Sequence, residues 1–482
     1  MKVNRSRSVR RFAVTADGRN LVSHAGTALL AELADRTGLT GAMSEALDGC
    51  GISWNTHDPG VVLTHLGVAI ADGADCLSDF EVLREQSELF GDVASLSTAW
   101  RAVKATTSLE LRRIRTAVAA ARENVWRAAP PGDITIDVDA TLLNVHSEKQ
   151  EATATYKRGF GFHPLGSWCD TTAEPLDAIL RTGRAGANDA DDHLELLDRT
   201  LAVLPAEYQL GHQPGDDPSL VAHHILLRAD SAGCSHGFVG GLVEANIEYS
   251  IGHHVDANVR EALLLFQEED WENAVEDNGS VRDGAFVAEL TDLMDLSSWG
   301  EGVRLICRRE RPHPGAQLSL FDMSEGFRHT CFITNSTNDL DVPALECRHR
   351  GHARVEDRIR NWKDCGLQNL PFASFTQNLA WVSASLIAGA LLAWAQMTCL
   401  DGELTKAEPK AIRYRILHVA ALLVRRGGRL ILRLDETGRG RRRFSEPSSS
   451  CGPPSRRSQG HGARPDNGEY SRGVTSEQST NL

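Results

Sequence analysis

Acidic residues stand at the ends of two apolar segments, where they could bind a metal ion. Asp137 and Asp139 lie in the alternating segment 132–143, and Asp230 follows the apolar run in 223–233. A carboxylate inside a strand is costly unless it is paired or bound to metal. In open α/β sheets, sites form at the carboxyl ends of strands. Each acid taken alone reads as a turn cap, but two acids on separate strands favour a metal site.

A third acid, Glu356, lies in the charged segment 348–366. On a helix, Glu356, Arg360 and Lys363 share one face. That spacing would place a metal-binding carboxylate and a phosphate-binding ammonium along one line. An exposed, salt-bridged helix is the alternative that the spacing leaves open. The apolar stripe beside this face, suited to burial, is Val355, Ile359 and Trp362.

The elements that position these acids can be read from periodicity. Alternation over 132–143 predicts a strand with the two aspartates on one face and the isoleucines on the other. Further strands are expected at 163–170 and 175–182, followed by a helix to about residue 204. Together with the strand at 223–233, they predict a mixed α/β unit.

The first 130 residues read instead as helical. Residues 29–40 break at Gly38 in the manner of a helix-turn-helix, although many helical hairpins do the same. A helix with a good N-cap is expected to start at 95–103, and the helix 108–128 carries five arginines. This part of the chain is a candidate for DNA contact.

The later part of the chain has a different texture. Residues 241–335 read as mixed and partly β, and residues 336–400 as helical. The segment from Cys365 to Leu400 carries no charge, which raises a membrane span at 378–400 as an alternative. Polar residues interrupt the run, so we expect a buried core helix instead. From about residue 437 the chain is rich in Arg, Ser, Gly and Pro, which predicts a disordered tail.

Composition describes a globular chain of 482 residues with a net charge of −14. The charge is uneven: residues 1–20 carry +5 and residues 401–482 carry +7, around an acidic middle. Basic ends suit a nucleic-acid backbone, whereas the average does not. The ten cysteines form no C-x-x-C pair and no apolar segment follows the basic N-terminus. We therefore expect a cytoplasmic protein.

Several ordered motifs together resemble the DDE transposases of bacterial insertion sequences, above all the thirteen-eighty family of insertion sequences. They are Ile-Asp-Val-Asp-Ala-Thr-Leu (136–142), Leu-Leu-Arg-Ala-Asp-Ser-Ala-Gly (226–233) and Arg-Val-Glu-Asp-Arg-Ile (354–359) with Lys-Asp-Cys-Gly (363–366). The resemblance extends over roughly residues 10–430. It includes segments beginning Ser-His-Ala-Gly (23–39), Ala-Asp-Gly-Ala-Asp (71–79), Ala-Glu-Pro-Lys (407–410) and Arg-Tyr-Arg-Ile-Leu-His (413–420).

The resemblance implies an RNase H-like core interrupted by a largely β insertion. The expected layout is a helical DNA-binding region (1–130), the first part of the core (131–240), the insertion (241–335), a helical second part of the core (336–435) and the tail (436–482). It also implies inverted-repeat and target double-stranded DNA as partners, held by at least a dimer, with no membrane.

The same resemblance gives the site residues their roles. Asp139, Asp230 and Glu356 match the three catalytic acids, and Asp137 is the alternative to Asp139. They are expected to hold two Mg²⁺ or Mn²⁺ ions, which suit carboxylate oxygen. Hydrolysis at the element's ends would free a 3′-OH that attacks target DNA.

Basic residues near Glu356 are expected to touch DNA phosphate. These are Lys363, Arg360 and Arg354. The sequence departs from the Tyr-x2-Arg-x3-Glu-x6-Lys signature of related transposases, because His349 and His352 stand at the Tyr and Arg positions. Arg350 or Arg354 is left to supply that contact. A catalytically inactive DNA-binding derivative is the alternative function, because the tail does not look like the family's usual ending.

Overall fold

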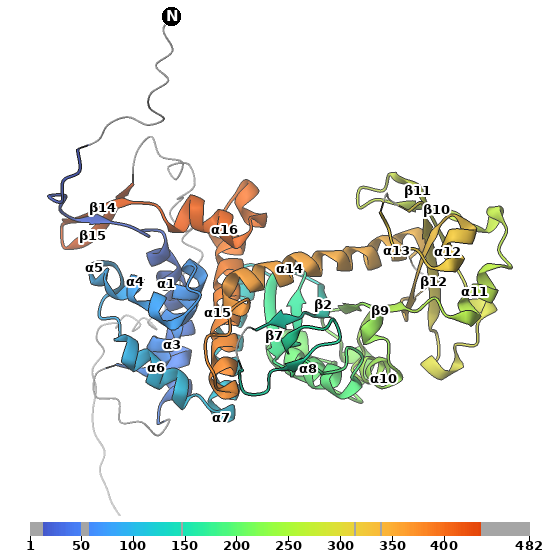
Figure 1. Cartoon of the computed structure of the whole chain (residues 1–482), viewed down its shortest axis with the longest axis horizontal. Coiled ribbons are helices and arrows are strands. Elements are labelled where there is room, and N and C mark those ends of the chain that lie inside the picture. Colours follow the sequence, from blue (N-terminus) through green and yellow to red (C-terminus); the bar gives the residue numbers. More distant parts are fainter. Residues whose placement is uncertain (1–12, 50–56, 146–147, 313–314, 338–339, 435–482) are drawn as a thin grey trace, which may run out of the picture. The chain divides into compact units, whose positions relative to one another are not determined.

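The computed structural model describes residues 13–49, 57–145, 148–312, 315–337 and 340–434. The expected tail and the basic residues of the first twelve positions lie outside these ranges. The described chain is a mixed α/β protein built around one large sheet (Figure 1).

That sheet has nine strands and joins parallel and antiparallel parts. In spatial order the strands are β10 (Glu272–Val275), β11 (Val281–Glu289), β12 (Arg304–Glu310), β13 (Arg328–Thr334), β9 (Glu248–His253), β8 (Ile225–Ala229), β2 (Ile134–Ala140), β6 (Leu165–Cys169) and β7 (Glu174–Ile179). β2, β8 and β9 run parallel to one another, and the remaining pairs are antiparallel. The strands expected at 132–143, 163–170, 175–182 and 223–233 are all confirmed.

Helices cover both faces of the β2 region. Val138 pairs with Ser167, whose hydroxyl lies 2.7 Å from that of Thr200 on α8 (Ala190–Ala202). Asp137 pairs with Trp168, whose ring meets Trp362 of α14 (Val355–Trp362) on the other face. Alternation along the strand thus puts α8 and α14 on opposite sides of the sheet. The remaining helices of this part are α9 (Ala206–Gln209) and α10 (His236–Glu244).

In residues 13–49 and 57–133, the described part of the chain ahead of the sheet, the regular structure is helical apart from the short strand β1 (Leu21–Val22), as expected for residues 1–130. The helices are α1 (Thr27–Arg36), α2 (Leu39–Leu47), α3 (Pro59–Asp72), α4 (Glu81–Arg84), α5 (Ser87–Phe90), α6 (Leu96–Ala105) and α7 (Ser108–Ala128). Gly38, with φ of 82°, separates α1 from α2 where the sequence predicted a break. Ser95 caps α6, and Thr107 and Glu110 form a capping box on α7.

The segment between β9 and α14, the helix that carries Glu356, contains four further strands of the large sheet. β10 to β13 extend the sheet from β9, accompanied by α11 (Ala257–Leu263) and α12 (Leu320–Glu325). α13 (Val342–Arg350) then leads into α14. A small sheet of β3 (Leu143–Asn144), β5 (Phe160–Phe162) and β4 (Thr153–Ala154) lies beyond the end of β2.

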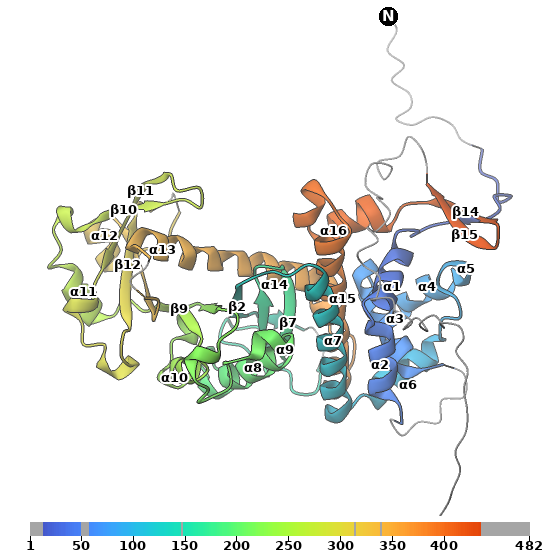
Figure 2. The same ribbon diagram turned by 180° about the vertical axis from the view of Figure 1, so that it is seen from behind.

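The long apolar helix is α15 (Phe375–Thr398), which contacts α3, α7 and β7 (Figures 1 and 2). Among the described residues it is the one helix long and apolar enough to cross a membrane by itself, but 78% of its apolar window is buried inside the protein. Contacts within the fold therefore account for its apolar surface. α16 (Pro409–Ile412) follows, and β14 (Ala421–Arg426) pairs with β15 (Arg429–Leu434) and β1.

A buried carboxylate ties the N-terminal helices to the sheet. Glu174 of β7 is fully buried and accepts hydrogen bonds from Arg122 Nε (3.0 Å) and Trp126 Nε1 (2.6 Å) of α7, and from Trp394 Nε1 (2.8 Å) of α15. Thr172 adds a fourth donor at 3.0 Å. A buried charge needs such complete pairing, so this contact fixes α7 and α15 against the sheet.

Candidate active site

Three predicted acids lie near the carboxyl end of β2. Asp139 is the penultimate residue of β2, and Asp230 directly follows the adjacent parallel strand β8. Because Val138 pairs with Ala229, the next residues of the two strands, Asp139 and Asp230, stand side by side. Glu356, in the first turn of α14, comes from a helix packed on β2. Burial and the charges of Asp230 and Glu356 raise the pKa of Asp139 to about 6.

The position of α14 along β2 explains why Glu356 reaches this point. His352 Nδ1 lies 2.8 Å from Asp137 Oδ1, which anchors the start of the helix to the strand. His352 lies in the 3-10 turn Gly351–Arg354 that leads into α14, so the four residues from His352 to Glu356 advance about 7 Å, close to the about 6.6 Å of two strand residues. Moving from His352 to Glu356 therefore matches moving from Asp137 to Asp139 on the same face of the sheet.

Asp137 is engaged differently from Asp139. It is fully buried, and both of its oxygens accept from Arg228, with Nε and Nη2 each at 2.8 Å. With His352 as a third partner, its carboxylate is neutralised and saturated. Asp139 is partly exposed, and its carboxylate accepts a hydrogen bond from the backbone N–H of Ala140 at 2.6 Å. The two acids that the sequence left as alternatives therefore differ in their hydrogen-bond partners.

Arginines gather around a second buried acid, Asp170. It accepts from Arg228 at 2.8 Å, from Arg354 at 2.5 Å and from Arg358 at 3.3 Å. Burial alone would raise the pKa of Asp170, but the hydrogen bond from Arg354 and the charges of Arg228 and Arg358 hold it below the ordinary value. Arg354, expected to contact phosphate, is therefore bound to a carboxylate, although its side chain stays 46% exposed.

Lys363 borders a pocket of about 310 Å³ that begins next to Asp139. The pocket is lined by Ala140, Thr141, Leu142, Asn144, Tyr156, Lys157, Gly159, His163 and Lys363. Burial lowers the pKa of Lys363, the charge of Asp139 opposes that change, and Lys157 adds to it. Two ammonium groups beside the acids make this pocket suited to an anion such as a phosphate.

His349 and His352, which stand where the related signature has Tyr and Arg, have different surroundings in the fold. His349 stacks on Phe332, with ring centroids 4.2 Å apart, and bonds Ser250 at 2.8 Å. Burial, reinforced by the charges of His352 and Arg228, lowers the pKa of His349 to about 3. His349 is therefore a neutral packing residue, whereas His352 adjoins the acids.

Arg360 lies on the exposed side of α14 and pairs with Asp357 at 2.9 Å and Glu408 at 2.7 Å. Of the three basic residues predicted to contact phosphate, Lys363 is the one whose pKa is affected by Asp139. Arg354 and Arg360 both form ion pairs with carboxylates. This matches the exposed, salt-bridged helix that the spacing had left open as an alternative.

The three acids do not form a compact ligand group by distance. In the part of the chain that the structure describes, one group of three has its ligand atoms within 4.8 Å of one another, namely His24, Asp72 and His418. The acids of the β2 region are instead linked by register, by packing and by their mutual effect on the pKa of Asp139.

Sequence reasoning missed the residues that support the acids. Arg228, Asp170 and Arg358 form the buried network beneath them, and Lys157 adds the second ammonium. Arg228 carried a usable signal, since a charged residue inside an otherwise apolar strand needs a buried counter-charge. Asp170 and Lys157 carried none, because only the fold brings them to this place.

Comparisons with known proteins identify the family of the chain. A family model described as transposase DDE domain group 1 matches residues 4–446. A piggyBac transposase in a synaptic complex with hairpin DNA is a structural match at 11% identity and a TM-score of 0.39, covering 84% of this chain and 82% of that one. A search of the curated proteins finds no match. The family match spans most of the chain, and the protein therefore belongs to the DDE transposases.

Proposed function

We propose that this chain is an active transposase that uses Asp139, Asp230 and Glu356 as its acidic triad. The observation that carries the proposal is structural: the register of β2 and β8 places Asp139 beside Asp230, and α14, which bears Glu356, packs on β2. Burial and the charges of the other two acids raise the pKa of Asp139 to about 6, in keeping with this arrangement. A negatively charged cluster without a bonded cation among the described side chains is suited to divalent metal. Carboxylate oxygens are the ligands that Mg²⁺ and Mn²⁺ prefer.

The donor set fits a two-ion site. Asp139, Asp230 and Glu356 would hold the ions, and Asp139 is the one of the three that is partly buried. Asp137 is not a ligand in this proposal, since Arg228 and His352 occupy its oxygens. When bound, two divalent ions supply activation of the attacking oxygen and stabilisation of the leaving oxygen of a phosphodiester.

The protein's own groups have separate tasks. Lys363 and Lys157 hold a DNA phosphate at the pocket beside Ala140 as point charges. The Arg228 network keeps β2, β8 and α14 in register, so that the three acids stay together. The reaction is hydrolysis at the element's ends to free a 3′-OH, followed by attack of that hydroxyl on target DNA.

The proposal extends to the fold of the catalytic core, its insertion and the partners of the chain. The sheet order β7-β6-β2-β8-β9, with the last three strands parallel, supports an RNase H-like core. β10 to β13 support an insertion between Asp230 and Glu356. We also propose membership of the thirteen-eighty family of bacterial insertion sequences, a dimer on DNA, the helical region 1–130 as the reader of the ends, and a cytoplasmic location without membrane contact.

Cleavage of end DNA tests the proposal. Duplexes that carry the terminal inverted repeats of the element are incubated with the full chain and Mg²⁺. Asp139→Asn and Glu356→Gln should each abolish nicking and retain binding of the duplex in a mobility-shift assay. Asp357→Asn, next to Glu356 on an exposed face, is the matched control and should cut normally. Nicking by both triad variants would refute the assignment, and binding without nicking by the unaltered chain would support the inactive derivative.

A further inference from the structure

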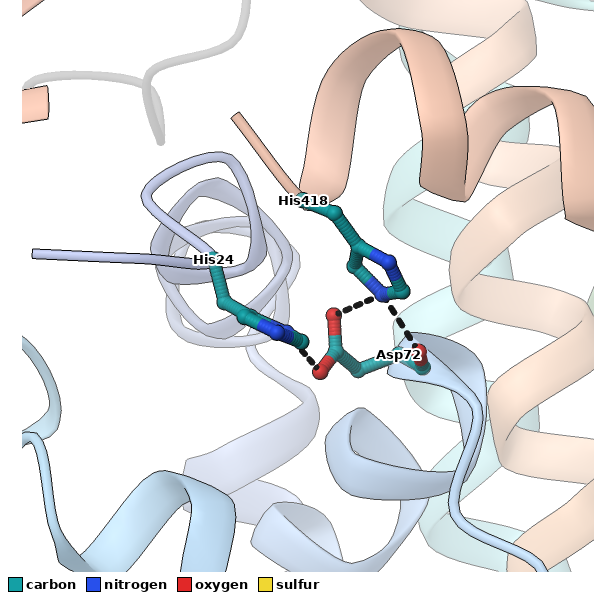
Figure 3. Close-up of side chains that lie close together, drawn as sticks. All are labelled: His24, Asp72 and His418. Atoms are coloured by element: carbon teal, nitrogen blue, oxygen red, sulfur yellow. Dashed lines mark hydrogen bonds and ion pairs between the residues drawn. The ribbon is translucent and has the colours of Figure 1, made fainter. Parts of the chain in front are cut away.

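A second cluster of ligand-type side chains lies away from the acids of β2, on other elements. His24 precedes α1, Asp72 ends α3, and His418 follows the helical turn 413–417 (Figure 3). All three belong to segments that the sequence analysis singled out and that the proposed catalytic site does not use.

The three side chains converge closely. His24 Nδ1 lies 2.6 Å from one oxygen of Asp72, and His418 Nε2 lies 3.2 Å from the other. The two imidazole rings are 4.2 Å apart between centroids. The ligand atoms of all three lie within 4.8 Å of one another. This is the spacing expected of groups that can share one small cation.

The Asp72 carboxylate is held in place by hydrogen bonds, and the side chains beside it that can balance its charge are the two histidines. Asp72 is buried, and the hydroxyl of Thr27 donates to it, which orients it from the outer side. Within the described ranges, no lysine or arginine bonds to this carboxylate. Arg413, the nearby guanidinium, donates instead to the carbonyls of Ala71 at 2.8 Å and Ile70 at 3.2 Å.

The setting also favours positive charge. Asp72 is the last residue of α3, where the carbonyl end of the helix carries partial negative charge. Hydrogen bonds from His24 and Thr27 hold the carboxylate in place.

We propose that His24, Asp72 and His418 bind a zinc ion. Two imidazoles and one carboxylate are ligands that Zn²⁺ takes, with water completing four-coordination. In the metal-free structure, Nδ1 of His24 donates to the Asp72 carboxylate and Nε2 of His418 donates to the Asp72 carbonyl. To bind zinc, each of these nitrogens would give up its proton and present its lone pair, and each ring would keep a proton on its other nitrogen. The hydroxyl of Thr27 holds the carboxylate, as outer-shell groups do in zinc sites.

The ion would serve as a clasp between distant parts of the chain. β1 pairs with β14 immediately beside the cluster in sequence, between residues 21–22 and 421–422. A ligand from each side of that pairing and a third from α3 would hold the N-terminal helices to the C-terminal strands. Because the unfolded chain lacks this arrangement, binding would stabilise the fold.

Metal titration of the full chain tests the clasp. The protein carries Asp139→Asn and Glu356→Gln, so that the acids of β2 do not contribute, and is stripped with EDTA. Zn²⁺ is titrated by calorimetry, and Co²⁺ is titrated by its visible absorption. His418→Gln removes a ligand but can still donate to the Asp72 carbonyl, which His418 Nε2 contacts at 2.8 Å. His224→Gln, at an exposed histidine outside the cluster, is the matched control.

We expect one Zn²⁺ per chain, a Tm that rises with Zn²⁺, and intense Co²⁺ absorption of the tetrahedral kind. His418→Gln should weaken binding by more than the about 10–100-fold that loss of an outer-shell partner costs. His224→Gln should bind as the parent does. If His418→Gln does not fold in EDTA, His24→Gln replaces it. Equal stoichiometry and affinity in parent and ligand variant, or no Zn²⁺ bound by the parent, would overturn the proposal.

Discussion

Replacing Asp139 with Asn should abolish cleavage and yet stabilise the metal-free protein. The pKa of Asp139 is raised from 3.8 to about 6. At about 1.4 kcal/mol per pKa unit, ionising this carboxyl in the fold costs up to about 3 kcal/mol more than in the unfolded chain. Asn removes that cost and keeps the oxygen that accepts from the backbone N–H of Ala140.

The direction of the change in folding stability with pH follows from the raised pKa of Asp139. A raised folded-state pKa means that the folded chain holds the proton more tightly, so stability falls as pH rises from about 4 to about 6. The advantage of Asp139→Asn over the parent should therefore be about 3 kcal/mol at pH 7.5 and shrink to roughly half of that at pH 5. Thermal unfolding in EDTA across this range measures it.

Asp137→Asn is the matched comparison, two residues away on the same face of β2. Its amide would leave the buried guanidinium of Arg228 facing a donor, and breaking a buried pair costs about 3–5 kcal/mol. Neighbouring Asp→Asn changes should thus move Tm in opposite directions. A Tm for Asp139→Asn below that of the parent at pH 7.5 in EDTA, or a gap that does not narrow toward pH 5, would refute the reasoning.

Three further results are expected. Glu174→Ala should lower the unfolding free energy by about 3–5 kcal/mol, because Arg122 is left buried without its charge partner; chemical unfolding measures this, and Glu174→Gln should lose less. The apparent affinity for Mg²⁺, followed by thermal shift, should fall up to about tenfold per pH unit below about pH 6, since Asp139 must lose its proton to bind. Lys363→Ala should weaken binding of end DNA and reduce the slope of its salt dependence by about one, and an unchanged slope would place Lys363 off the phosphate.

Local sequence patterns predicted many of the helices and strands. Alternation over 132–143 predicted β2, and the apolar run at 223–233 predicted β8. The stripe of Val355, Ile359 and Trp362 predicted the buried face of α14, and all three side chains are buried. These features depend on periods of two and 3.6 residues, which neighbouring residues set by themselves. The family was indicated differently, by the resemblance of the ordered acidic motifs to those of DDE transposases.

What the sequence determined by itself was therefore the elements, the family and a short list of acids. It named Asp139 first and left Asp137 as the alternative, because both share one face of one strand. The tertiary structure gives the two carboxylates different partners: Arg228 and His352 bond the carboxylate of Asp137, and Asp139 lies beside Asp230 and Glu356. The pairing of Glu174 with Arg122, and the meeting of His24, Asp72 and His418, were likewise decided by folding, since these contacts join residues tens to hundreds of positions apart and no local period encodes them.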